Sequence, residues 1–105
     1  MLHVFVKGNA AISYRFAPAD EWQLEEARLH LSAVGGATEN FTIALDSVMG
    51  DEYDATLSTS AMAAAASVQY KPTRPDQFIS GDALMFAYTN TNHQGWGLEI
   101  IYSHI

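Results

Sequence analysis

Short segments in which apolar and polar residues alternate constrain the fold of this chain more than any other feature. Residues 2–7 and 12–16 show this pattern near the amino terminus, and residues 41–45, 53–57 and 96–102 repeat it further along. Successive side chains of a β-strand point to opposite faces of the sheet, whereas a helix repeats its face about every 3.6 residues. The pattern therefore predicts strands that bury one face and expose the other.

The segment of residues 22–33 changes its buried face part-way along. Its large apolar residues occupy even positions before Glu25-Glu26 and odd positions after them. A strand can change its buried face only if it contains an extra residue, so the pattern predicts a β-bulge or bend at these two glutamates. A helix that begins at Asp20, with acidic residues in its first turns, is the alternative that the pattern leaves open.

The carboxyl-terminal half contains the remaining predicted strands and two predicted loops. Residues 83–88 are apolar on both faces, which predicts a central strand covered on both sides. Residues 67–70 form another predicted strand. The alanine-rich residues 61–66 before it are too few to hold a helix alone, so we expect a loop or one turn there. Pro72 and Pro75 bracket the second loop.

About eight short strands with turns roughly every 8 to 12 residues are typical of a β-sandwich. A chain of 105 residues is close to the commonest size of one domain. We therefore predict an all-β fold, namely an antiparallel, jelly-roll-like β-sandwich that occupies residues 1–105 as a single domain.

The charge of the chain excludes some classes of partner. Its formal net charge is −7, from 12 acidic residues against 5 Lys and Arg. A phosphate backbone or an anionic membrane surface would repel such a chain, so we expect neither nucleic acid nor membrane as a partner. We also expect no signal peptide and no membrane-spanning segment, because no basic lead or long apolar run is present. The five cations form no basic stripe; they are Lys7, Arg15, Arg28, Lys71 and Arg74.

Composition indicates an oligomer or a larger assembly. Hydrophobic residues make up 49% of the chain and charged residues only 16%, against roughly 25% in an average globular protein. Little charge is then left to keep an isolated monomer in solution, so we expect a homo-oligomer. Cysteine is absent, which excludes disulfides, thiolate nucleophiles and thiolate metal sites.

Two sets of side chains are candidate metal ligands, and neither has the spacing of a known site. The loop of residues 46–54 is rich in acids, but it lacks the alternate carboxylates and the closing glutamate of an EF-hand. We interpret it as a solvated turn and leave calcium binding there open. The four histidines do not have the spacing of metal ligands, so we interpret them as structural or surface residues. The acids are Asp46, Asp51, Glu52 and Asp54, and the histidines are His3, His30, His93 and His104.

No motif for catalysis is present, so we expect no catalytic residue, no cofactor and no metal. A Gly-x-Ser-x-Gly elbow and a Gly-x-x-x-x-Gly-Lys loop are both absent. Carboxylate pairs for glycosidic chemistry can be drawn from many acids, but the sequence does not place two of them in one cleft. The acids that we considered are Glu25, Glu26, Asp82 and Glu99.

Several other residues are assigned to the fold. Trp22 and Trp96 lie on faces that otherwise carry Leu or Ile, so we predict core packing for both. The roles of Tyr53 and Tyr102 stay open between core and binding surface. Gly81, Asp82 and Asn90 are interpreted as turn residues that determine the fold, with no ligand assigned.

The stretch from Trp22 to the end of the chain resembles a pattern found in small virion proteins of tailed bacteriophages. The resemblance consists of strand and turn positions and contains no catalytic motif, so it transfers no binding residue. It implies a jelly-roll-like module such as a capsid cement or decoration protein, or a tail or fibre component. The matching parts are residues 22–32, 38–47, 52–57, 81–82, 88–92 and 96–100.

Together with the charge and the strand pattern, the resemblance implies a non-enzymatic capsid cement protein. Its expected partners are the major capsid protein or other virion proteins, and its expected place is the exterior of the capsid or the tail. The resemblance also implies a homo-oligomer, with a trimer favoured. A carbohydrate-binding or receptor-binding module of a tail or fibre is the alternative. A small hydrolase is a third interpretation, which requires two ionisable groups that converge in a cleft.

Overall fold

The computed structural model describes residues 1–105 and confirms the predicted all-β fold. It contains nine strands and one short 3-10 turn, and none of its helices is long and apolar enough to cross a membrane. The elements are β1 (Leu2–Gly8), β2 (Ile12–Phe16), β3 (Trp22–Leu31), β4 (Asn40–Asp46), η1 (Asp51–Tyr53), β5 (Ala55–Ala61), β6 (Ser67–Tyr70), β7 (Asp76–Phe78), β8 (Ala83–Tyr88) and β9 (Trp96–His104).

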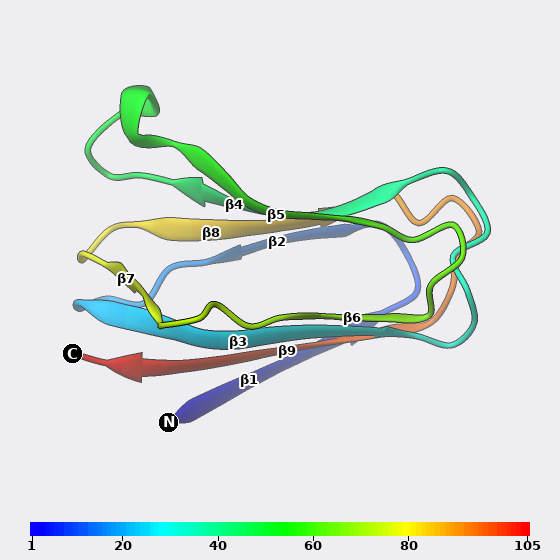
Figure 1. Cartoon of the computed structure of the whole chain (residues 1–105), viewed down its shortest axis with the longest axis horizontal. Coiled ribbons are helices and arrows are strands. Elements are labelled where there is room, and N and C mark those ends of the chain that lie inside the picture. The colour runs from blue at the N-terminus through cyan, green and yellow to red at the C-terminus, as the bar shows by residue number, and fades with distance from the viewer.

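The strands form two antiparallel sheets that face one another as a sandwich (Figure 1). The first sheet has the order β1-β9-β3-β6, and β7 also pairs with β3. The second sheet has the order β2-β8-β4-β5. The first and last strands therefore pair directly, with Leu2 opposite Tyr102 and Gly8 opposite Trp96.

The space between the sheets is filled by one cluster of 16 buried residues. Trp22 lies within an aromatic group at one end of it, with ring centroids 5.2 Å from Phe16 and 4.6 Å from Phe78. Its indole N–H is buried without a hydrogen-bond partner, which costs roughly 1–3 kcal/mol. Each neighbouring ring offsets this by about 0.5–1.5 kcal/mol beyond the burial of apolar area. The predicted core role of Trp22 is confirmed.

A β-bulge in β3 changes the buried face of the strand, as predicted. Leu24 is opposite Tyr102, whereas Glu26 is opposite the preceding residue of β9, Ile101, so Glu25 is the extra residue. The helix alternative for this segment is wrong. The bulge lets Leu24 and Ala27 both face the core, and it turns the even-numbered residues that follow, such as Arg28, onto the outer face of the first sheet.

Two predictions about strands are wrong in detail, and one strand was not predicted. β8 lies in the middle of its sheet, but Ala87 on its outer face is exposed, because the molecule has only two layers. The strand expected at residues 53–57 begins at Ala55 and continues to Ala61, because η1 takes up Tyr53. β7 was not expected; it has only three residues and follows Pro75 directly.

The turn residues hold the ends of the strands together as predicted. Gly81 has a φ of 95°, which favours glycine, and the buried carboxylate of Asp82 follows it. Asn90 is almost fully buried, and its side-chain amide donates to the carbonyl oxygens of Ala10 and Gln94 at 3.0 Å. It therefore ties the turn before β9 to the chain that enters β2.

Candidate functional site

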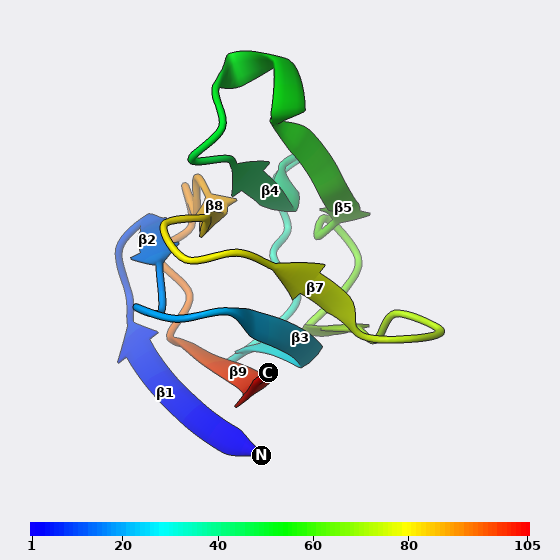
Figure 2. The same cartoon turned by 90° about the vertical axis from the view of Figure 1, so that its left-hand side faces the viewer.

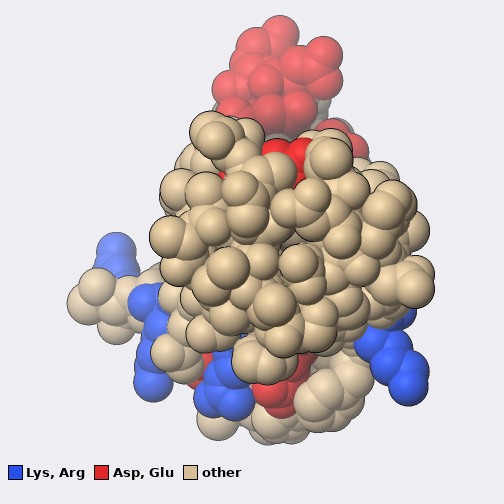
Figure 3. Space-filling view, turned by 90° about the vertical axis from the view of Figure 1, so that its right-hand side faces the viewer, with Lys and Arg blue, Asp and Glu red and all other residues tan.

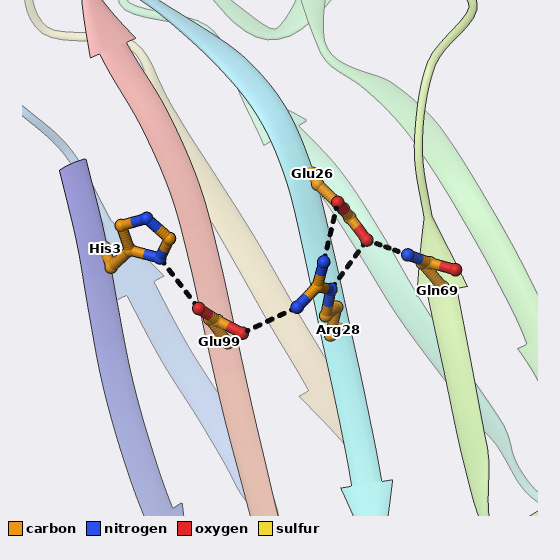
Figure 4. Close-up of polar contacts among 5 residues, drawn as sticks. All are labelled: His3, Glu26, Arg28, Gln69 and Glu99. Carbon is orange, nitrogen blue, oxygen red and sulfur yellow. Dashed lines mark hydrogen bonds and ion pairs between the residues drawn. The ribbon is translucent and has the colours of Figure 1, made fainter. Parts of the chain in front are cut away.

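A chain of polar side chains crosses the outer face of the first sheet (Figure 4). Arg28 donates from Nε to Glu26 at 2.7 Å and from Nη1 to Glu99 at 3.3 Å. His3 Nδ1 lies 2.8 Å from the other oxygen of Glu99, and Gln69 donates to Glu26. The structure thus brings together two of the four carboxylates considered for catalysis, with an arginine between them.

This arrangement fixes the charge of Glu26. The carboxylate is buried, and hydrogen bonds from Arg28 and Gln69 hold its pKa below the ordinary value. The same contact with Glu26 raises the pKa of Arg28. Glu26, Arg28 and Glu99 form an ion-pair network. The lowered pKa of Glu26 is the opposite of the raised pKa that a general acid needs.

A hollow of about 540 Å³ opens beside this network, above Gly97 in β9. Gly97 lies between Lys7 of β1 and His30 of β3, and a Cβ atom placed on it would meet no heavy atom within 4 Å. The hollow therefore exists because this position carries no side chain. We call it the Gly97 groove; its lining residues are Phe5, Val6, Lys7, Arg28, His30, Gly97, Leu98 and Glu99.

Phe5 forms an exposed aromatic wall of the Gly97 groove. Its side chain is 73% exposed and stacks on His3, with ring centroids 6.1 Å apart. A single exposed aromatic residue is normal on a protein surface, so Phe5 points to a binding surface only together with the hollow beside it. Phe5 is not among the residues predicted from the sequence. The alternation in residues 2–7 nevertheless places it on the outward face, beside His3 and Lys7.

The connection between β4 and β5 forms a second exposed feature. Residues 47–54, which include η1, project from the body of the sandwich, and we call them the acidic tip (Figure 2). Figure 3 shows its acidic side chains gathered beyond the tan surface, whereas the Lys and Arg side chains lie toward the opposite side. The tip also exposes Val48, Met49 and Tyr53, at 53%, 62% and 62%.

Asp82 braces the base of the acidic tip. One of its carboxylate oxygens accepts the backbone N–H of Val48 at 3.0 Å, and the other accepts that of Ile79 at 3.1 Å. Within the tip, Asp54 accepts the backbone N–H of Ser47 at 2.7 Å. These bonds hold both ends of the projecting connection, so the exposed apolar side chains are presented on a fixed frame.

The candidate metal ligands are not brought together. No group of three or more His, Asp or Glu side chains is placed to hold a metal ion. Asp46 pairs with Arg15 at 3.2 Å, away from the tip carboxylates. The histidines are dispersed: His3 contacts Glu99, His30 lines the groove, His93 lies in a turn, and His104 packs edge-on against Tyr102.

The remaining aromatic candidates divide between the core and the surface. Trp96 is only half-buried, and its indole N–H donates to the carbonyl oxygen of Ala10 at 2.9 Å, so it packs at the rim of the core. Tyr102 is half-buried within the aromatic group around Trp22. Tyr53 alone lies in solvent, on the acidic tip.

A scan against models of protein families found no match to this chain, and a search of curated proteins found no related sequence. The resemblance to small phage virion proteins therefore stays a prediction.

Proposed function

We propose that this chain is a non-enzymatic assembly module that works by binding other proteins through the acidic tip. The observation that carries the proposal is the exposure of Val48, Met49 and Tyr53 together on a projection with three carboxylates around them. Apolar and aromatic side chains surrounded by a polar rim are the usual composition of a protein-binding surface.

The way the tip is attached supports the same function. A mobile loop would lose conformational entropy when it bound a partner, and that loss would weaken the complex. Asp82 and Asp54 fix the backbone at the base of the tip in the free protein. The contact surface is therefore formed before the partner arrives, and less affinity is lost in ordering it.

Within this function, we place the chain on the exterior of a phage capsid as a cement protein, with the major capsid protein or other virion proteins as partners. The resemblance in strand and turn positions supports this placement. The strand order supports a jelly roll, because β1 pairs with β9, β2 with β8, β3 with β6 and β4 with β5. The net charge of −7 suits a surface that does not contact the genome.

The proposal is tested by mixing the purified chain with empty phage shells and measuring co-sedimentation and the temperature of shell disruption. We expect binding and a higher disruption temperature, because many modest contacts add through avidity. Replacing Met49→Ser and Tyr53→Ser together is expected to weaken binding at least about tenfold, as the loss of a buried aromatic contact does.

Val34→Ser is the matched control, because Val34 is 51% exposed and lies in the loop after β3, at the end of the sandwich away from the tip (Figure 1). It removes a comparable apolar side chain and is expected to leave shell binding unchanged. Absence of binding by the unaltered chain, or equal binding by the tip variant and the control, would contradict the proposal.

A further inference from the structure

We propose that the acidic tip of one copy of this chain docks into the Gly97 groove of a second copy. This inference rests on the proposed function, in which the tip binds other proteins of the particle, and it names a second copy of the chain as one of them. Both surfaces are present on the same chain; each has exposed apolar surface, and their unpaired charges are of opposite sign.

The groove has one exposed aromatic wall and one cation that is free to pair. Phe5 contributes the exposed hydrophobic side chain of its lining, whereas the side chains of Val6 and Leu98 pack against the core. Lys7 and His30 stand on either side of Gly97. Arg28 already pairs with two carboxylates, those of Glu26 and Glu99. Lys7 makes no ion pair within the chain, so it is the cation of the groove that remains free to pair with a partner.

The tip has the complementary composition. Asp51, Glu52 and Asp54 carry negative charge and make no ion pair within the chain, while Met49 and Tyr53 are exposed beside them. Docking would place the apolar side chains against the groove lining and a tip carboxylate against Lys7. Complementary charge of this kind sets the orientation of two partners and raises their rate of association.

The positions of the two surfaces decide the type of interface. Figures 1 and 2 show that the tip projects from the second sheet, on the side away from the first sheet. The residues that line the groove belong to β1, β3 and β9, so the groove lies on the outer face of the first sheet. The tip of one copy therefore cannot reach the groove of the same copy. Two different patches that meet form a heterologous contact, which builds a ring when the rotation closes and an open chain when it does not.

The test uses light scattering to measure molar mass over a range of concentrations, with no shells present. We expect the unaltered chain to form multimers. Lys7→Glu and Glu52→Lys each place like charges at the contact and are expected to weaken association at least about tenfold. Arg74→Glu makes the same charge change outside the groove and is expected to have no effect.

Mixing the two variants separates this inference from other modes of association. The unaltered tip of the Lys7→Glu protein meets the unaltered groove of the Glu52→Lys protein, and the reversed tip of the second meets the reversed groove of the first. The mixture is therefore expected to form multimers although each variant alone does not. The altered residues are exposed, so circular dichroism should show that both variants fold.

A monomer at all concentrations would overturn the inference, as would multimers that are insensitive to Lys7→Glu or a mixture that fails to associate. Binding of a glycan to the groove of a monomeric protein, lost in Phe5→Ala, would also overturn it. The proposed function is measured separately with shells. Shell binding without self-association rejects only the present inference, and self-association without shell binding rejects only the placement of the chain on a capsid.

Discussion

Replacing Gly97 should make the protein more stable. Gly97 lies in the interior of β9 between Lys7 and His30, in a backbone conformation open to any residue, and a Cβ atom there has no neighbour within 4 Å. Glycine within a strand costs about 0.5–1 kcal/mol relative to alanine, and β-branched residues suit a pleated, half-exposed surface best. Gly97→Val is therefore expected to raise the free energy of unfolding by about 1 kcal/mol.

For a domain of this size, 1 kcal/mol corresponds to a change in Tm of about 4–5 °C, since the entropy of unfolding is near 2.1 cal/mol/K per residue. Thermal unfolding followed by circular dichroism measures this change. The protein should be dilute enough to be monomeric, because self-association would add its own stabilisation. The same variant fills the Gly97 groove, so it should also lose self-association while its Tm rises.

Gly35→Ala is the contrasting control. A Cβ atom at Gly35 would lie 2.5 Å from the backbone oxygen of Met62 and 2.6 Å from the hydroxyl of Tyr88, so the backbone must shift. We expect this variant to lose about 2 kcal/mol or more, as overpacked sites do. If Gly97→Val lowers Tm as Gly35→Ala does, then the fold itself needs Gly97, and the reasoning about the groove is refuted.

Three further predictions concern the polar groups that brace the fold. Asp82→Ala leaves two backbone N–H groups without their charged acceptor and should cost about 2–3 kcal/mol in urea unfolding. Burial and a hydrogen bond to Asp76 raise the pKa of Tyr70 from 10.0 to about 12. The contribution of Tyr70 to the stability of the fold is therefore complete below pH 10 and is lost as the pH rises toward 12. In Tyr70→Phe the free energy of unfolding should fall less over this pH range. Arg28 lowers the pKa of Glu26, so the contribution of Glu26 to the stability of the fold is present above pH 4.5 and is lost as the pH falls through its folded-state pKa. In Glu26→Gln the free energy of unfolding should fall less as the pH is lowered through this range.

Most of the fold was predictable because the alternation of apolar and polar residues indicates which face of each strand is buried. The bulge at Glu25 is the sharpest case, since the change from even to odd apolar positions required one extra residue. β7 was not predictable in this way, because three residues after Pro75 are too few to show a period. The prediction that residues 83–88 are covered on both faces was wrong, because an apolar composition alone does not show whether a third layer of structure exists.

The site was less predictable than the fold. The outward position of Phe5 followed from the pattern of residues 2–7, but its importance depends on the empty space above Gly97. The space forms because β9 lies between β1 and β3 in the sheet. This order of strands cannot be read from the sequence. The ion-pair network has the same origin, because Glu26 and Glu99 are 73 residues apart in the chain and meet only through Arg28 across paired strands.

Cross-linking between copies tests the contact of tip and groove most directly, because the chain contains no cysteine of its own. One protein carries Glu52→Cys, and a second, distinguishable by an added tag, carries His30→Cys. After mixing and treatment with a short thiol cross-linker, the account predicts a cross-linked pair of one tip variant and one groove variant. Ser13→Cys, on the exposed face of the second sheet, should give no such pair with the tip variant. Equal cross-linking of the tip to both positions, or none to the groove, would contradict the account.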